Sequence, residues 1–253
     1  MGLFDLPAPI LTWLDHQLSG FLPAWCWMVI LALVSSVLSM GLYAWISPQQ
    51  KLKQFQQEAQ KARSELSKYD GEFDGLPPLV KRVLGLSLKH LGMILLPAMA
   101  ASLPLICILV WLSNHYGPEV PVGGETVCVQ THPADIETLK VFPERTAGGE
   151  GKRCLAWPAD AKITLQDEKR QLSWSLDMAL PVGRVHKKSW WNYLIANPAG
   201  YLPDDLPLEW ITFDFKDRQI IALGPDWMRG WEASFLISLL IFSIAIKIIF
   251  KIE

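Results

Sequence analysis

The chain has 253 residues, of which 51% are hydrophobic, and its formal net charge at pH 7 is −2. A charge this close to zero argues against a strongly basic nucleic-acid-binding protein, and we expect no nucleic-acid partner. The hydrophobic share slightly exceeds the roughly 45–50% of an ordinary globular domain, and the excess is concentrated in three segments.

Residues 1–20 predict an amphipathic arm that lies outside the membrane, in its interface. The segment is too short and too polar to span a bilayer. Pro7 and Pro9 are expected to interrupt its helix, because proline removes a backbone donor. Gly20 and Pro23 then turn the chain toward the membrane.

Three apolar segments are long enough to cross a bilayer: residues 24–46, 91–112 and 231–250. About 20 apolar residues, at about 1.5 Å of rise per residue, cross the hydrocarbon core. Trp25 and Trp45 lie near the two ends of the first segment, as in the aromatic belts of membrane proteins. We therefore expect an α-helical membrane protein with three transmembrane helices.

Basic residues set the expected orientation. Residues 1–46 contain no Lys or Arg, whereas residues 47–90 contain eight. Basic residues near span ends stay in the cytoplasm, which places residues 47–90 inside and the N-terminus outside. The C-terminus, with Lys247 and Lys251, is then cytoplasmic. We expect a multi-pass protein of the inner (cytoplasmic) membrane, without a cleavable signal peptide.

Residues 47–90 predict a cytoplasmic coiled-coil hairpin. Apolar residues in the first half recur at spacings of three and four, as in a coiled-coil seam. Ser47 is expected to be the N-cap of the first helix, with Pro48 at the first helical position and Gln50 completing a capping box. Residues 70–78, rich in Asp, Gly and Pro, predict the tip. The second helix is expected to run on into the second span.

Residues 114–228 predict a small, mainly β, extracytoplasmic domain inserted between the second and third spans. Segment 189–195 is expected to be a short helix or an apolar surface knob. The runs that favour strands are residues 126–130, 162–166, 171–176, 209–215 and 219–223. The last two runs are expected to pair as a hairpin.

The four cysteines fall into two groups. Cys26 and Cys107 lie in predicted spans, where cysteine acts as a small hydrophobic residue. Cys128 and Cys154 lie in the predicted extracytoplasmic domain, which faces an oxidising compartment. We expect a disulfide between them, worth about 3 kcal/mol by loop-closure entropy. The alternative is two free, buried thiols.

The sequence contains no motif of a common catalytic or metal site. The five histidines lack zinc-ligand spacing, and HExxH, GxSxG, P-loop and GxGxxG patterns are absent. His132 and Asp135 fall in one loop, but such a pair belongs more often to the surface than to a site. We therefore expect a protein that is not an enzyme and has no cofactor and no metal.

Polar side chains inside the spans form the candidate site. Ser35, Ser39 and Tyr43 recur every four residues and share one helix face. In one interpretation, serines allow helices to pack closely. In the other, the stripe faces a hydrated groove for substrate. The residues that would line this groove are Ser35, Ser39, Tyr43, Ser102, Ser234, Ser238 and Lys247.

In residues 4–14, 47–51, 91–103 and 224–244, the order and character of the elements resemble the YidC/Oxa superfamily of membrane-protein insertases. It is most similar to the minimal three-span branch, which includes the archaeal YidC-like proteins and the insertase subunit of the ER membrane complex. The resemblance covers about half the chain and does not extend to the domain between the second and third spans.

The resemblance implies an insertase or insertion chaperone that passes newly made membrane proteins with short translocated ends through a polar groove. Such a groove lowers the cost of moving polar groups through lipid, which is several kcal/mol for each unpaired group. A positive residue marks the groove in the bacterial members. The corresponding region here, residues 39–43, contains neither Arg nor Lys.

The alternative function belongs to a different class. In that interpretation the spans only anchor the domain at residues 114–228, and this domain binds an envelope partner as a structural or interaction protein.

Overall fold

The computed structural model describes residues 2–71, 75–133, 139–142, 144–147, 152–158, 160–167 and 172–251. Its contacts divide the chain into two compact units. The first comprises Met1–Trp27 and Cys107–Ser234, and the second comprises Met28–Ile106 and Phe235–Glu253. Each unit is described by itself.

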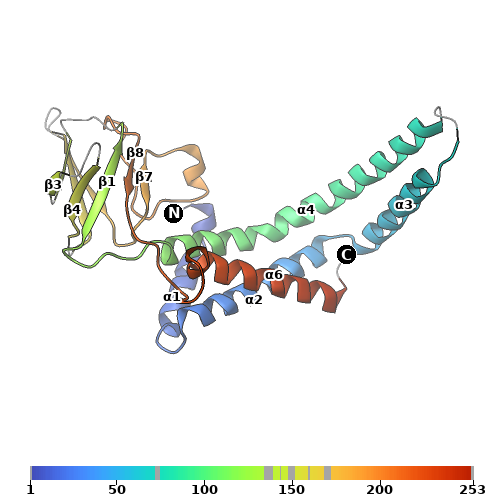
Figure 1. Ribbon diagram of the computed structural model, residues 1–253, viewed down its shortest axis with the longest axis horizontal. Helices are drawn as coiled ribbons and strands as arrows, with labels where there is room; N and C mark the ends of the chain where they lie inside the picture. Colours follow the sequence, from blue (N-terminus) through green and yellow to red (C-terminus); the bar gives the residue numbers. More distant parts are fainter. Residues whose placement is uncertain are drawn as a thin grey trace. The chain divides into compact units, whose positions relative to one another are not determined.

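Three helices are long and apolar enough to cross a membrane: α2 (Ala24–Ile46), α4 (Leu76–Tyr116) and α6 (Trp231–Phe250). This confirms the three predicted apolar helices of a multi-pass membrane protein. Helix α4 is continuous over 41 residues, as Figure 1 shows, although Pro97 and Pro104 lie inside it. Its length of about 60 Å is twice the hydrocarbon thickness, so part of α4 must extend beyond the bilayer.

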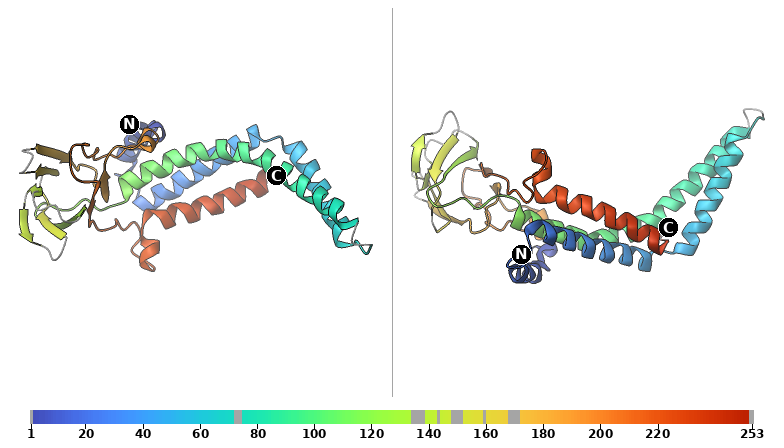
Figure 2. Two further views of the ribbon diagram at one scale, coloured as in Figure 1. Left: turned by 90° about the horizontal axis from the view of Figure 1, so that it is seen from above. Right: turned by 60° about the horizontal axis from the view of Figure 1, so that its bottom comes forward.

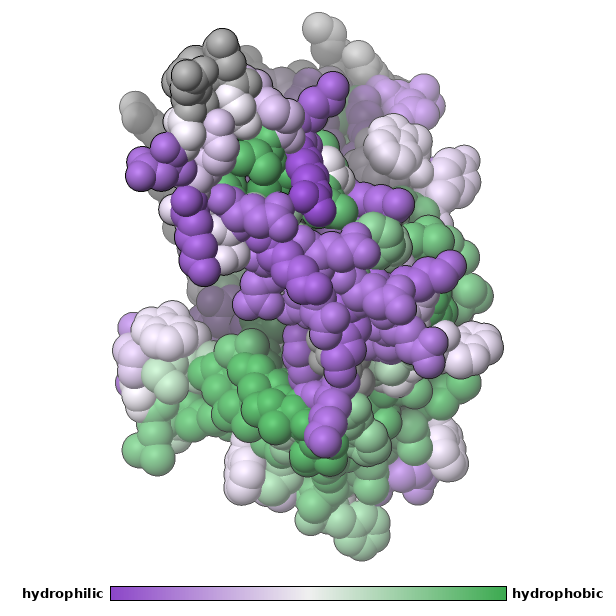
Figure 3. All heavy atoms as spheres, turned by 90° about the vertical axis from the view of Figure 1, so that its right-hand side faces the viewer, coloured by the Kyte–Doolittle hydropathy of each residue, from purple (hydrophilic) through white to green (hydrophobic). Residues whose placement is uncertain are grey.

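Helix α3 (Gln49–Ser67) and the first part of α4 lie side by side within the second unit. An Arg82 guanidinium nitrogen lies 2.9 Å from a Glu65 carboxylate oxygen, and Lys89 Nζ lies 4.6 Å from the centre of the Phe55 ring. Hydrophilic residues gather at the end of the molecule where these two helices lie (Figure 3). Exposed ion pairs of this kind contribute little stability each, so the apolar seam of α3 must supply most of the packing.

The predicted start of α3 is wrong by one residue. The helix begins at Gln49, Pro48 is the residue before it, and no side chain caps it. The Ser47 amide donates to the Tyr43 carbonyl oxygen at 2.8 Å, so Ser47 closes the last turn of α2 instead. Pro48 has φ −77° and ψ 73°, which is not helical, and this local conformation separates the two helices.

The N-terminal arm, residues 2–18, consists of a 3-10 helix, η1 (Leu3–Asp5), and helix α1 (Ala8–Leu18). The predicted interruption occurs at Leu6 and Pro7. Pro9 does not break the helix because it lies in the first turn of α1, where a missing backbone donor loses no intrahelical hydrogen bond.

Residues 117–225, here called the β region, form two antiparallel sheets between α4 and a short helix, α5 (Asp226–Arg229). The five-stranded sheet has the order β3-β4-β1-β8-β7, and the three-stranded sheet has the order β2-β5-β6. The strands are β1 (Thr126–His132), β2 (Leu139–Phe142), β3 (Glu144–Ala147), β4 (Lys152–Ala156), β5 (Lys162–Asp167), β6 (Leu172–Asp177), β7 (Arg184–His186) and β8 (Trp210–Phe213). This confirms a small antiparallel β region between the second and third apolar helices.

Both sheets contribute to one hydrophobic core. Alternate residues of β1 and β5 point inward, among them Val127, Val129 and Ile163, and Leu176 of β6 joins them; all four are at most 3% exposed. The period of two in burial is what a sheet with one buried face requires.

The predicted hairpin between residues 209–215 and 219–223 is wrong. Strand β8 pairs with β1 and β7. The amides of Ile220 and Ile221 donate to the Arg229 carbonyl oxygen, at 2.7 and 3.2 Å, so this run packs against α5 and forms no strand. Strand β8 instead lies between β1 and β7, so both of its edges are hydrogen-bonded within the five-stranded sheet.

Cys128 and Cys154 form a disulfide, as expected, and the alternative of two free thiols is wrong. The two residues are direct partners in the antiparallel pairing of β1 with β4. The bond therefore joins two strands of one sheet, whereas Cys26 and Cys107 are free.

Replacing Cys128 with serine is expected to lower the free energy of unfolding of the β region by about 3 kcal/mol, because the 26-residue loop gains entropy in the unfolded state. Near-ultraviolet circular dichroism of the full chain in detergent, recorded against denaturant, measures this change. Cys26→Ser, which removes a free thiol, is the control. Equal midpoints for Cys128→Ser and the control would contradict the prediction.

Candidate functional site

A serine contact joins α2 to α6 within the second unit. The Ser36 hydroxyl donates to the Leu239 carbonyl oxygen at 3.2 Å, and the Ser243 hydroxyl donates to Ser36 Oγ at 3.2 Å. Ser36 is fully buried. Sequence analysis did not select Ser36 or Ser243 for the site, although the serine doublet at positions 35 and 36 was the available signal.

Ser35 and Ser39, one helical turn apart on α2, differ in how their hydroxyls are satisfied. Ser35 is fully buried and donates to the Leu31 carbonyl oxygen at 2.6 Å within its own helix. Its environment is that of a serine in a helix-packing interface. Ser39 Oγ is also buried, but it has no hydrogen-bond partner among the described residues. A buried hydroxyl without a partner costs about 1–3 kcal/mol. Among the described residues of α2, Ser39 Oγ shares this state with the indole nitrogen of Trp27.

The other predicted groove residues are satisfied locally or exposed. Ser102 donates to the Met99 carbonyl oxygen at 2.7 Å, within α4. Ser234, in the first unit, donates to the Gly230 carbonyl oxygen at 3.4 Å. Tyr43 and Ser238 are half-buried, and Lys247 is exposed. Among the described residues, no side-chain hydrogen bond joins any of them to Ser39 Oγ.

The N-terminal arm is hydrogen-bonded to the β region within the first unit. The buried Asp5 carboxylate accepts from the amides of Gly2 and Ala196, at 2.8 and 2.9 Å. The Phe4 amide donates to the Leu194 carbonyl oxygen at 2.9 Å. A Cβ atom at Gly2 would lie 2.5 Å from that oxygen, so this close approach requires glycine. These contacts fix the arm against residues 194–196.

Helix α1 is held against the last turns of α4 in the same unit. Trp111 Nε1 donates to Thr12 Oγ1 at 3.0 Å, and the Tyr116 hydroxyl donates to the Asp15 carboxylate. The Arg218 guanidinium lies 4.8 Å from the centre of the Tyr116 ring. The arm therefore bridges the end of α4 and the β region.

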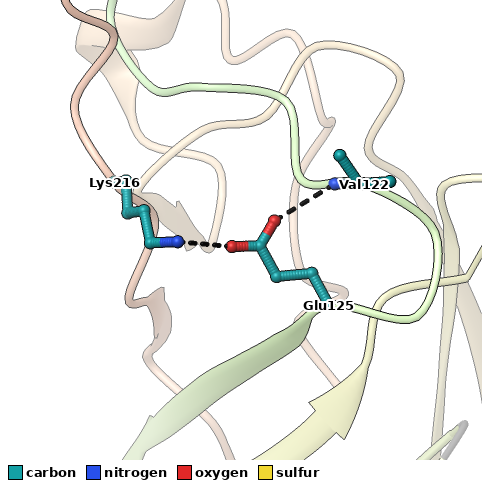
Figure 4. Close-up of polar contacts among 3 residues, drawn as sticks. All are labelled: Val122, Glu125 and Lys216. Carbon is teal, nitrogen blue, oxygen red and sulfur yellow. Dashed lines mark hydrogen bonds and ion pairs between the residues drawn. The ribbon is translucent and has the colours of Figure 1, made fainter.

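An ion pair near the start of β1 links Glu125 to Lys216 at 2.7 Å, and the same carboxylate accepts from the Val122 amide at 3.2 Å (Figure 4). The hydrogen bond from Lys216, assisted by that from Val122, lowers the pKa of Glu125 below its usual value. The hydrogen bond to Glu125 raises the pKa of Lys216. Lys216 is exposed, so the pair contributes little stability.

Among the residues that the structure describes, no group of three His, Cys, Asp or Glu side chains is placed to hold a metal ion. His132 stacks on Trp210, with 4.0 Å between ring centres, and Asp135 lies outside the described residues.

Comparison of the chain with protein-family models, with curated proteins and with solved structures finds no match. The likeness to the YidC/Oxa superfamily therefore rests on the order and character of the elements alone.

Replacing Asp5 with alanine is expected to release the arm, because the buried Gly2 amide and the part-buried Ala196 amide lose their acceptor, at a cost of about 2–4 kcal/mol. Hydrogen exchange of the full chain in nanodiscs should show faster exchange at the amides of residues 3–6 and 194–196. Asp226→Ala removes a fully exposed carboxylate and is the control. Unchanged exchange in Asp5→Ala would contradict the docking role.

The pair of Glu125 and Lys216 predicts a pH dependence. The lowered pKa of Glu125 gives a stabilisation that is present above its usual pKa and is lost as the pH falls through the lowered value. The raised pKa of Lys216 gives a second stabilisation, which is lost only as the pH rises through that raised pKa. Unfolding midpoints of the wild type and Glu125→Gln should differ slightly at pH 7 and converge at strongly acid pH. A difference that persists at strongly acid pH would contradict this.

Proposed function

We propose that this protein is a membrane-protein insertase or insertion chaperone of the YidC-like type. The order of an amphipathic arm, an apolar helix, a charged two-helix segment and two further apolar helices supports this. In the proposal, α3 and the first part of α4 form a cytoplasmic coiled-coil hairpin. The N-terminus lies outside the inner membrane, and the C-terminus is cytoplasmic.

The observation that carries the proposal is the Ser39 hydroxyl, which is buried in an apolar helix without a partner among the described residues. Lipid offers no hydrogen bonds, so an unpaired hydroxyl at membrane depth is costly unless water or a substrate group can reach it. In the proposal, Ser39 faces a polar path for the short translocated end of a newly made membrane protein. Ser36 and Ser243 hold α2 and α6 together beside it.

A second feature, an exposed apolar face of α4, supports the binding of apolar substrate segments. The first part of α4 carries an exposed apolar stripe formed by Val80, Leu84 and Leu88. The stripe continues along the same helix at Leu91 and Leu95. In the proposal, an apolar substrate helix binds this stripe and follows α4 toward the bilayer.

Replacing Ser39 with leucine is expected to lower insertion of substrates with short translocated ends several-fold, because the path loses its polar group. Insertion into proteoliposomes, scored by protease protection, measures the effect. Val37→Leu, on an exposed part of the same helix, is the control and should insert normally. Equal insertion by the two variants would count against the polar path.

The alternative function, an anchored interaction protein, is favoured by a different observation. The β region has its own hydrophobic core and a disulfide, as a binding module would need. A photoreactive amino acid at position 39, compared with one at Leu33, separates the two functions in living cells. Adducts from position 39 with many newly made membrane proteins support the insertase. A single abundant partner, or adducts within this chain only, supports the anchor.

A further inference from the structure

The β region carries an exposed aromatic turn. The 3-10 helix η3 (Trp190–Tyr193) leaves Trp190 77% exposed and Tyr193 69% exposed. Large aromatic side chains are rarely left in water on a globular surface, because burying each one is worth several kcal/mol. Exposed apolar surface that is kept in place marks a site of interaction.

This turn is rigid. The Asn192 side chain is buried, accepts from the Ser189 amide at 2.7 Å and donates to the Ile195 carbonyl oxygen at 3.4 Å. Trp191, which is less exposed, lies beside the His186 ring, with 4.8 Å between ring centres. Trp190 and Tyr193 are therefore presented by a fixed backbone.

The aromatic turn is joined to the N-terminal arm. The hydrogen bonds of Phe4 with Leu194 and of Asp5 with Ala196 place η1 beside η3, and Figure 2 shows the two lying together. The arm exposes further apolar side chains, among them Trp13, which is 62% exposed. We call the combined set the aromatic surface: Leu6, Ile10, Trp13, Trp190, Tyr193 and Leu194.

Chain connectivity places the aromatic surface at a membrane boundary. Only residues 19–23 separate α1 from the apolar helix α2, and five residues span at most about 18 Å. Helix α1 also contacts the last turns of the apolar helix α4 through Thr12 and Trp111. A surface fixed to this arm lies near the level at which both helices leave the bilayer.

The positive charge of Lys188, beside the aromatic surface, is suited to binding lipid headgroups. Lys188 Nζ lies 4.9 Å from the centre of the Tyr193 ring, whereas Lys187 Nζ donates to the Asp204 carbonyl oxygen at 2.8 Å. Aromatic side chains with an adjacent ammonium group are the composition that favours the headgroup layer, where the rings meet glycerol and the ammonium meets phosphate.

We propose that the aromatic surface binds the bilayer interface and holds the β region against the membrane on the side where α1 lies. The occupant is lipid: the rings of Trp190 and Tyr193 enter the headgroup layer, and Lys188 pairs with lipid phosphate. This inference is independent of the insertase proposal, because an anchored interaction protein would present the same surface.

Spin labels on the full chain test this proposal. Single cysteines replace Trp190, Tyr193 or, as a control on strand β6, the partly exposed Trp174, in a Cys26→Ala, Cys107→Ala background that keeps the disulfide. The labelled protein is placed in nanodiscs of phosphatidylcholine and phosphatidylglycerol. Collision rates with oxygen, which partitions into lipid, are compared with those of a polar nickel complex, which stays in water.

The ratio of the collision rate with oxygen to that with the nickel complex should be several-fold higher for labels at positions 190 and 193 than for the label at position 174. The same preference for nickel at all three positions would place the aromatic surface in water and overturn the proposal. Low access to both reagents at 190 and 193 would mean that protein covers the surface, and would overturn it as well. An intact disulfide on a non-reducing gel verifies folding of each variant.

Discussion

A bilayer interior offers no hydrogen-bond partner, and this constraint governs where each polar group of the long helices lies. The hydroxyls of Ser35 and Ser102 are satisfied by carbonyl oxygens of their own helices, and that of Ser36 by α6. Among the described residues, Ser39 departs from this pattern, as do the indole nitrogens of Trp27 and Trp231. The departure gives the proposed polar path its physical basis, because a group without an internal partner gains most from an external one.

The β region is stabilised by different constraints. It is small, and its single core is shared by two sheets, so the disulfide between β1 and β4 adds a constraint that burial alone does not supply. The N-terminal arm adds a second constraint, since the Asp5 carboxylate accepts hydrogen bonds from the Gly2 amide of the arm and from the Ala196 amide of the β region. The same contacts bring apolar arm residues next to the exposed rings of η3.

Sequence patterns predicted the elements whose signal is local. Uninterrupted apolar runs identified α2, α4 and α6, and β-forming runs identified β1, β5, β6 and β8. Strands β2, β3, β4 and β7 were not predicted. Strand β4, for example, begins with Lys152 and Arg153, and its pairing with β1 decides its conformation. The serine spacing selected Ser39 but missed Ser36, because period alone does not reveal which helix lies opposite.

By itself, the sequence determined the three apolar helices and the amphipathic arm, and it indicated the disulfide without excluding free thiols, because length, hydropathy and cysteine placement are local properties. Only the tertiary structure decided the pairing of β8, the serine contact of α2 with α6, and the joining of the arm to η3. Each of these depends on contacts between residues far apart in the chain. No local pattern encodes such contacts, since burial and hydrogen bonding are settled when the elements pack together.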